Sequence, residues 1–304
     1  MRFWLIVFTI IFTAYFSIQR YLHPHLNHNS TIDRISHPLD TRLRYRIGEI
    51  DPRFHMSREH LALLAQQGAD IWHQGTMKGL FVYDPHAKLA INLIYDERQA
   101  ESTARQQELN ILENTQQYQN NERSNIEKLR AELDQSNREI NIYKVNYESK
   151  VSQYNQFVQS INQSNQSLHP STQAQLEQLK NQLDTERINL SQKLALHNQK
   201  VNQLNQLVDA LNSNTQQFNH SVDQFNARFQ PRQFDKGMFN GESINIYEFQ
   251  SDADLRVTIA HELGHALGLL HNTDPKALMY PIMKEQDLQN FRLTAADLAM
   301  LNSR

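Results

Sequence analysis

The sequence predicts a mixed α+β domain that is interrupted by a long antiparallel coiled-coil hairpin and preceded by an apolar N-terminal helix. Three observations lead to this fold class: an apolar run at the N-terminus, strand and helix patterns at both ends of the remaining chain, and sustained heptads between them. The predicted boundaries are a membrane segment at 1–19, a linker at 20–42, a discontinuous domain at 43–96 and 231–304, and an inserted hairpin at 97–230.

The overall composition excludes several classes of protein. Of the 304 residues, 39% are hydrophobic, below the roughly 45–50% of typical domains, so we expect part of the chain to lie outside a compact core. The net charge of -3 gives no basic surface for phosphate groups, which argues against a nucleic-acid partner. Because there is no cysteine, disulfides and cysteine-rich zinc modules are excluded. A metal site in this chain must use histidine and carboxylate ligands.

The N-terminus is typical of an export signal or a membrane anchor. Arg2 precedes a run from Phe3 to Phe16 that is apolar except for Thr9 and Thr13. A cleaved signal needs small residues one and three positions before the cut, and the stretch after Thr13 has no such pair. We therefore expect a single-pass transmembrane helix with the rest of the chain outside the cytoplasm, at a bacterial cell envelope. Secretion after signal cleavage is the alternative.

Residues 20–42 show no apolar period and contain Pro24 and Pro38, so they predict a tether between the membrane and the domain. Four histidines of this segment could hold a metal, but nothing here fixes their geometry. We expect solvated linker residues at His23, His25, His28 and His37.

Residues 43–96 carry the first strand and helix signals of the domain. The stretch LRYRIGEI, from Leu43, alternates like a half-buried strand, and Ser57 is a good N-cap for a helix that Gly75 can end. Two further strand candidates, LFVY at 80–83 and LAINLIYD at 89–96, flank a turn-like DPHAK. A segment of about 50 residues is too short to cover both faces of such a sheet, so other parts of the chain must complete it.

Residues 97–229 are rich in Gln, Asn, Glu and Lys, and their apolar residues recur every seven positions. The main series are Ile126, Leu133, Ile140, Tyr147, Tyr154 and Ile161, then Leu176, Leu183, Leu190, His197, Leu204, Leu211, Phe218 and Phe225. Heptads without glycine predict a coiled coil rather than a disordered tract, and the break at SLHPSTQ predicts that the chain turns back. We interpret His197 as a polar core residue that sets the register.

Globular signals return after Pro231. FDKGMFNG is followed by a strand candidate, GESINIYEF, and by a helix that begins at Ser251 or Asp252. A half-built sheet, a long helical stretch and then another strand indicate an insertion within one domain. The two ends of the insertion must then lie close together, which an antiparallel hairpin allows.

The stretch HELGHALGLLH at 261–271 predicts a metal site. On a helix, His261 and His265 lie one turn apart on the same side, so two imidazoles can share one cation. Glu262 lies too far round the helix to bind the same ion but can reach a water beside it, which is the position of a general base. Gly268 can adopt the left-handed conformation that ends the helix and brings His271 back as a third ligand. Three protein ligands with an open fourth position favour a catalytic ion over a structural one.

This pattern, HExxHxxGxxH followed by Met279, is similar to that of the metzincin zinc proteases, and HELGHALGLLHNTDPKALMYPIM resembles their matrixin branch. The resemblance covers residues 238–301 well and 43–96 loosely. It implies a zincin fold, one catalytic Zn²⁺ on His261, His265 and His271, and hydrolysis of peptide bonds in a protein or peptide substrate. It also implies that Glu262 is the base and proton shuttle, that Met279 forms an apolar floor beneath the metal, and that an apolar substrate side chain packs against Pro281, Ile282 and Met283.

The chain departs from the matrixin pattern in two respects. Matrixins are kept latent by a prodomain cysteine, which this sequence lacks, and the hairpin enters where the family has the edge strand beside the substrate, of which FDKGMF is the expected remnant. The end, RLTAADLAML, resembles the closing helix of matrixins, with Thr294 and Asp297 as a capping pair.

A second functional hypothesis assigns the main role to the hairpin. Its heptads include aromatic and valine residues that a partner helix could cover, so a coiled-coil protein partner is expected. In that case the protein is an interaction or adaptor protein of the envelope whose zinc site is structural or only weakly catalytic. Both roles are compatible if the hairpin selects substrates for the protease.

Overall fold

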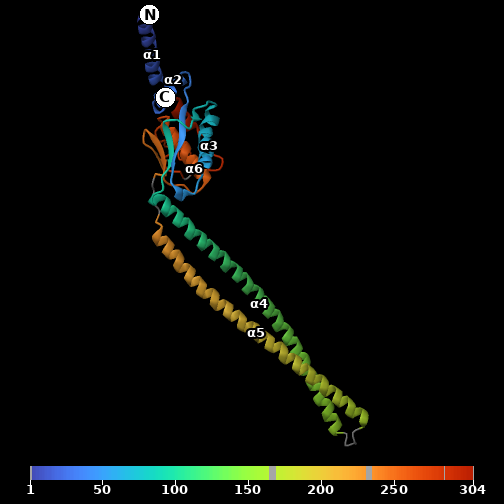
Figure 1. Ribbon diagram of the computed structural model, residues 1–304. Coiled ribbons are helices and arrows are strands. Elements are labelled where there is room, and N and C mark those ends of the chain that lie inside the picture. Colours follow the sequence, from blue (N-terminus) through green and yellow to red (C-terminus); the bar gives the residue numbers. More distant parts are fainter. Residues whose placement is uncertain (1, 164–168, 231–234, 284, 304) are drawn as a thin grey trace. The chain divides into compact units, whose positions relative to one another are not determined.

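The computed structural model describes residues 2–163, 169–230, 235–283 and 285–303 (Figure 1). The chain divides into two compact units, residues 1–107 with 231–304 and residues 108–230. The first unit contains a five-stranded sheet, and the second contains most of two long helices.

The sheet of the first unit has the strand order β2-β1-β3-β5-β4. Strands β2, β1, β3 and β5 are parallel, and β4 pairs antiparallel with β5 at the edge. The strands are β1 (Leu43–Ile50), β2 (Phe81–Tyr83), β3 (Leu89–Leu93), β4 (Gly237–Phe239) and β5 (Ser243–Ile246). The predicted mixed α/β fold is therefore confirmed, and strands from both sides of the long helices complete one sheet.

Strand β1 differs from its prediction in one respect. It is not half-buried, because only Glu49 of its eight residues is exposed. The strand lies between β2 and β3 in a parallel arrangement, and strands of this kind are usually covered on both faces. The apparent alternation of LRYRIGEI therefore reflects residue types and not burial.

Two helices of the first unit pack against each other and against the sheet: α3 (Arg58–Thr76) and α6 (Asp252–Ala266). At their crossing a Cβ atom on Gly68 would lie 3.0 Å from the carbonyl oxygen of Arg256, so glycine permits the close approach. The buried indole of Trp72 donates a 2.8 Å hydrogen bond to the Ala260 carbonyl. This hydrogen bond holds α6 at Ala260, the residue directly before the first predicted metal ligand, His261.

The predicted helix caps are confirmed. The Ser57 side chain accepts from the His60 N–H at the start of α3, and the Ser251 side chain accepts from the Asp254 N–H at the start of α6. The last helix, α7 (Ala295–Asn302), begins with a capping box formed by Thr294 and Asp297. The predicted stop of α3 at Gly75 is wrong by two residues: the helix continues to Thr76, and the left-handed Met77 ends it. A short 3₁₀ helix, η2 (Pro52–Phe54), precedes α3.

Helix α1 (Arg2–Leu22) contains the apolar run of the N-terminus. Within the described part of the chain, no helix is both long enough and apolar enough to cross a bilayer. The predicted transmembrane segment is therefore not supported. Its apolar run, from Phe3 to Phe16, is shorter than the roughly 17–25 residues that a span needs, and polar residues follow it.

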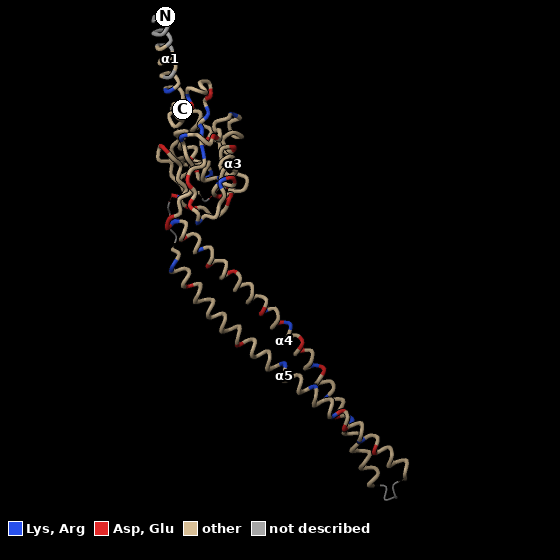
Figure 2. The backbone as a smooth tube through the Cα atoms, viewed as in Figure 1, with Lys and Arg blue, Asp and Glu red and all other residues tan. Residues whose placement is uncertain are grey.

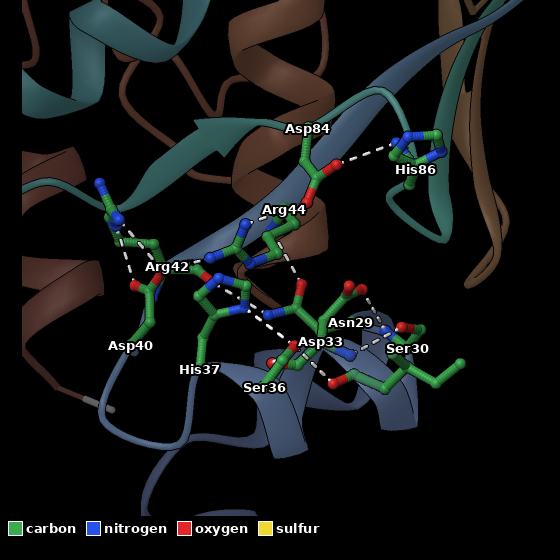
Figure 3. Close-up of polar contacts among 11 residues, drawn as sticks. Asn29, Ser30, Asp33, Ser36, His37, Asp40, Arg42, Arg44, Asp84 and His86 are labelled. Atoms are coloured by element: carbon green, nitrogen blue, oxygen red, sulfur yellow. Dashed lines mark hydrogen bonds and ion pairs between the residues drawn. The ribbon is translucent and has the colours of Figure 1, made fainter.

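The segment at 20–42, predicted to be a solvated tether, is largely exposed but contains regular structure and two buried residues. This segment forms η1 (Pro24–His28) and α2 (Thr31–Ser36), and Leu26 is only 1% exposed. The Asn29 side chain accepts from the Arg44 N–H at 2.8 Å and donates to the Arg42 carbonyl at 2.9 Å, which fastens the segment to β1 (Figure 3). One buried apolar side chain and several single polar contacts hold the segment in place, so the sequence shows no apolar period.

The same segment also contacts the edge strand β4 and the turn that follows it. The His28 ring lies 5.0 Å from the Phe239 ring, edge to face, and its Nδ1 is 3.0 Å from the Gly241 carbonyl oxygen. Burial lowers the pKa of His28. His28 is therefore a packing residue of the domain and not a solvated linker histidine.

The second unit consists of parts of α4 (Glu97–Gln163) and α5 (Pro170–Arg228). Polar contacts join the two helices in antiparallel register: Glu108 with Arg228, Gln119 with Asn214, Glu132 with Lys200, Ser136 with His197, and Lys150 with Glu186. Ile126, Leu133 and Ile140 of the first predicted series are buried. The regular core packing of a coiled coil stays a prediction. Basic and acidic residues alternate with long uncharged stretches along both helices (Figure 2).

Candidate metal centre

Helix α6 and the turn after it bring the three predicted histidines together. The His265 Nε2 atom lies 3.1 Å from the His261 Nε2 atom and 3.2 Å from the His271 Nε2 atom. Gly268 has a φ of 83°, the left-handed conformation predicted for it, and its N–H donates to the His265 carbonyl. The chain therefore reverses after the helix and places His271 beside the other two rings.

Hydrogen bonds to carbonyl groups fix the orientation of two of these rings. The Nδ1 atom of His261 is 2.6 Å from the Leu278 carbonyl oxygen, and that of His265 is 2.8 Å from the Leu269 carbonyl oxygen. A carbonyl oxygen can only accept, so each Nδ1 carries the proton and each Nε2 presents a lone pair. Burial lowers the pKa of both imidazoles, which keeps them neutral near pH 7.

The donor set fits a zinc ion. Two lone pairs that face each other at 3.1 Å repel unless a cation lies between them. Nitrogen atoms bound about 2.1 Å from one tetrahedral zinc are about 3.4 Å apart, close to the distances from His265 Nε2 to its two neighbours. The three ligand atoms all lie within 4.8 Å of one another. His261, His265 and His271 can therefore hold Zn²⁺ and leave its fourth position open.

Glu262 follows the first of these histidines and is 4% exposed. Burial is the main cause that raises the pKa of its carboxyl group to about 7; Asp235 raises it further, and a hydrogen bond from the Phe239 backbone opposes the shift. Its Oε2 atom is buried and has no hydrogen-bond partner among the described residues. A buried carboxyl group of this kind, beside a cation site, suits proton transfer.

Strand β4 supplies contacts to Glu262 that the sequence analysis did not identify. A Cβ atom on Gly237 would lie 2.9 Å from both Cγ and Oε1 of Glu262, so only glycine allows the strand to come so close. Residues 235–239 of the expected edge-strand remnant, FDKGMF, therefore lie next to the predicted base, whereas Phe234 lies outside the described residues. The signal was present in the sequence, because glycine inside a short strand often marks a close approach.

Met279 is fully buried, and hydrogen bonds hold its backbone: its carbonyl oxygen accepts from the Asn272 N–H at 2.7 Å, and its N–H donates to Asp297. Asp297 of α7, also fully buried, accepts hydrogen bonds from the N–H groups of Leu278 and Met279 at 2.9 and 3.1 Å. The Leu278 carbonyl in turn accepts from His261. Sequence reasoning gave Asp297 only a capping role, whereas it also holds the turn that orients a metal ligand.

The residues predicted to form the pocket wall lie just after this turn. Pro281 is exposed, and Ile282 and Met283 are half-buried. The Met283 sulfur is 3.9 Å from the hydroxyl of Thr258, one turn before His261 on α6. Met283 therefore packs near the start of the metal site, whereas the role of all three residues in binding a substrate stays a prediction.

In the metal-free protein, the buried side chains of His261 and Glu262 have opposite effects on how the free energy of unfolding changes with pH. The pKa of His261 is lowered from 6.5 to about 4, so between these values the unfolded chain binds a proton that the folded chain does not. This term lowers the stability as the pH falls. Glu262, with a pKa raised from 4.5 to about 7, holds a proton in the folded chain that the unfolded chain releases, so its term raises the stability as the pH falls through that window.

We therefore expect the metal-free Glu262→Gln variant to be more sensitive to acid than the metal-free parent. Between pH 7 and pH 5 its free energy of unfolding should fall by about 2 kcal/mol more, because only the histidine terms remain. Urea unfolding of both metal-free proteins at the two pH values measures this difference. Equal pH dependence in the two proteins would show that the Glu262 carboxyl group is not buried as described.

Comparison with known proteins identifies relatives of short segments of the chain. A macrophage metalloelastase of Oryctolagus cuniculus is 48% identical over 50 residues, 16% of this chain and 11% of that protein. A matrilysin of Felis catus is 50% identical over 38 residues, 12% of this chain and 14% of that protein. Matrix metalloproteinase-20 of Homo sapiens is 51% identical over 45 residues, 15% of this chain and 9% of that protein. The matched segments thus span between 9% and 14% of these relatives.

A much longer match is to the sequence model of a whole family. The model of the matrixins matches residues 41–303, which include the sheet, the histidine triad, the turn at Met279 and the closing helix. Because this match spans most of the chain and agrees with the geometry of the metal centre, the chain belongs to the matrixin family.

Proposed function

We propose that the protein is a zinc-dependent endopeptidase that hydrolyses peptide bonds of protein substrates. The observation that carries this proposal is the convergence of three imidazole Nε2 atoms beside a buried carboxyl group. Structural zinc sites are usually closed by four protein ligands, whereas the triad supplies three. This difference favours catalysis over the alternative of an adaptor protein with a structural zinc.

In the proposed reaction, different residues bind the metal, transfer the proton and orient the ligands. His261, His265 and His271 would hold the zinc ion, which when bound would supply Lewis-acid chemistry by making a nearby water more acidic and polarising a carbonyl group. Glu262 accepts the proton of the attacking water and delivers it to the leaving amine. Leu278 and Leu269 hold the rings of His261 and His265 through their carbonyl groups, and Met279 lies buried at the turn.

A peptide library tests this function directly. The full-length protein should cleave it, a chelator should abolish cleavage, and zinc added back should restore it. We expect an apolar residue directly after the cleaved bond, because Pro281, Ile282 and Met283 are proposed to line the pocket for that side chain. If the zinc-loaded protein cleaves no peptide in the library, the adaptor function becomes the better proposal.

We propose that the domain is discontinuous, with 43–96 and 231–304 forming the protease and 97–230 forming an arm that captures protein substrates or a helical partner. Several large apolar side chains of the arm are more than half exposed: Ile111, Tyr118, Ile142, Val145 and Leu196. Ile111 and Tyr118 also line a cavity of about 360 Å³ together with Phe218 of α5. Contiguous exposed apolar surface marks interaction sites, so we propose that the surface around Ile111, Tyr118 and Phe218 is where the arm binds.

Removal of residues 108–230, with Gln107 joined to residue 231 through a short Gly-Ser loop, separates the two parts of this proposal. We expect the shortened protein to cleave small peptides as the parent does and to lose most of its activity on a protein substrate, because the arm increases the local concentration of that substrate. Equal activity on protein substrates before and after removal would contradict a role of the arm in substrate capture.

We further propose that the protein acts outside the cytoplasm. The apolar N-terminal run and the absence of cysteine support this location. Fractionation of cells that express the full-length chain tests it: recovery of the protein only from the cytosol would contradict the proposal.

A further inference from the structure

Lys236 is the residue before strand β4, and its ammonium group lies between two buried carboxylates. Its Nζ atom is 2.6 Å from Asp254 Oδ2 and 3.2 Å from Glu248 Oε2. The side chains of Asp254 and Glu248 are only 3% and 1% exposed. Lys236 is therefore the cation that compensates two charges in the interior, at the point where the chain returns to the sheet.

The backbone of Lys236 is fixed as well. Its carbonyl oxygen accepts hydrogen bonds from the N–H groups of Tyr247 and Glu248, at 2.8 and 3.2 Å. Asp254 lies in the first turn of α6 and accepts from the Gln250 N–H in addition to its ion pair. Lys236 thus connects the start of β4 to the beginning of the helix that carries the metal ligands.

A second set of contacts comes from the first turns of α4. The Arg98 guanidinium donates to the carbonyl of Asp235 at 3.1 Å and lies over the Tyr247 ring, 3.5 Å from its centre. The Gln99 side chain both accepts from the N–H of Phe249 and donates to its carbonyl oxygen, at 3.0 and 3.2 Å. The start of the inserted helix is therefore bound to the strand and the loop that lead into the metal site.

These contacts act on the strand that lies against Glu262. Gly237 follows Lys236 directly, and its backbone lies so close that an added Cβ would be 2.9 Å from Glu262 Oε1. Two residues later, the Phe239 backbone donates a hydrogen bond to the Glu262 carboxylate. Because Gly237 is the first residue of this three-residue strand, a displacement of the Lys236 backbone would also displace Gly237.

We propose that Arg98 and Lys236 are positioning residues of the reaction. They fix Asp235 and the start of β4, so that Gly237 and Phe239 hold the Glu262 carboxylate in place at the metal centre. This inference rests on the proposed function of Glu262 as the base. Neither residue touches the substrate or the metal ligands, so their loss should affect turnover more than binding.

The test compares Lys236→Met and Arg98→Gln in the full-length, zinc-loaded protein, with the exposed Lys78→Met as the control. We expect kcat for peptide cleavage to fall about tenfold or more in Lys236→Met and less in Arg98→Gln, because small displacements of catalytic groups are costly. KM should change less than about twofold, and one zinc per chain should be retained. Lys236→Arg, which keeps the cation, should restore most of the lost activity.

Several outcomes would overturn the proposal. Unchanged kcat in both folded variants is one, and loss of zinc from either variant is another, because the effect would then act through the ligands. If Lys236→Met does not fold, the kcat of Arg98→Gln alone tests the proposal. The Arg98 side chain is 26% exposed, and its replacement leaves no buried charge unpaired, so we expect this variant to fold. Full activity of Glu262→Gln would instead show that the proposed function is wrong, so the two failures are distinguishable.

Discussion

Replacement of Glu262 by Gln is expected to lower kcat by about 10²–10⁴-fold while the protein keeps its zinc. The amide has the same shape as the acid and fits the same buried space, but it cannot accept a proton from the attacking water. The predicted zinc ligands are the imidazoles of His261, His265 and His271, so metal binding does not depend on the Glu262 carboxylate. Peptide cleavage rates and zinc content of the same preparation measure the effect.

The exposed Glu59→Gln provides the matched control, because it removes the same charge from the first turn of α3. Its kcat should equal that of the parent. A Glu262→Gln variant that cleaves peptides at the parental rate would show that another group is the base.

Replacement of Gly237 by Ala is expected to lower kcat by about 10²-fold, with zinc binding preserved. The new methyl group would lie 2.9 Å from both Cγ and Oε1 of Glu262 and 3.0 Å from Ile246 Cδ1. These distances are too short, so either strand β4 or the Glu262 side chain must move. Because β4 is at the edge of the sheet, we expect both the strand and the Glu262 side chain to shift. Steady-state kinetics with a fluorogenic peptide, together with zinc analysis, checks this expectation.

Gly79→Ala is the control for that substitution. A Cβ atom at Gly79 would meet only Arg42 Cδ, at 3.5 Å, which is ordinary contact. This variant should retain the parental kcat. Parental activity of Gly237→Ala would mean that β4 does not constrain the base.

The metal site could be predicted from the sequence because its geometry is local. Helical periodicity places His261 and His265 one turn apart, and one glycine conformation at Gly268 brings back His271. The helix caps at Ser57, Ser251 and Thr294 are local for the same reason.

The parts that could not be predicted depend on contacts between distant segments. Asn29 and His28 fold the supposed tether onto β1 and Gly241, and such single polar contacts leave no periodic pattern. The position of Gly237 against Glu262 needs the pairing of β4 with β5, which no local rule sets. Asp297 likewise has a capping pattern in sequence, and only the fold shows that it holds the turn at Met279.

The strongest alternative interpretation treats the histidine triad as a structural site. It would require a fourth protein ligand, and the three histidines are the only metal-ligand group found among the described residues of this chain. The Oε2 atom of Glu262, buried and without a hydrogen-bond partner in the described part of the chain, also has no role in a purely structural site. Catalysis accounts for both observations.

A zinc titration of the metal-free protein shows whether His261, His265 and His271 bind one zinc ion beside Glu262. We expect one tightly bound zinc per chain in the parent and in Glu262→Gln, and affinity reduced by at least about 10²-fold in His271→Ala. If the parent binds no zinc, or if His271→Ala binds zinc as tightly as the parent, the three histidines are not the ligands of a zinc site.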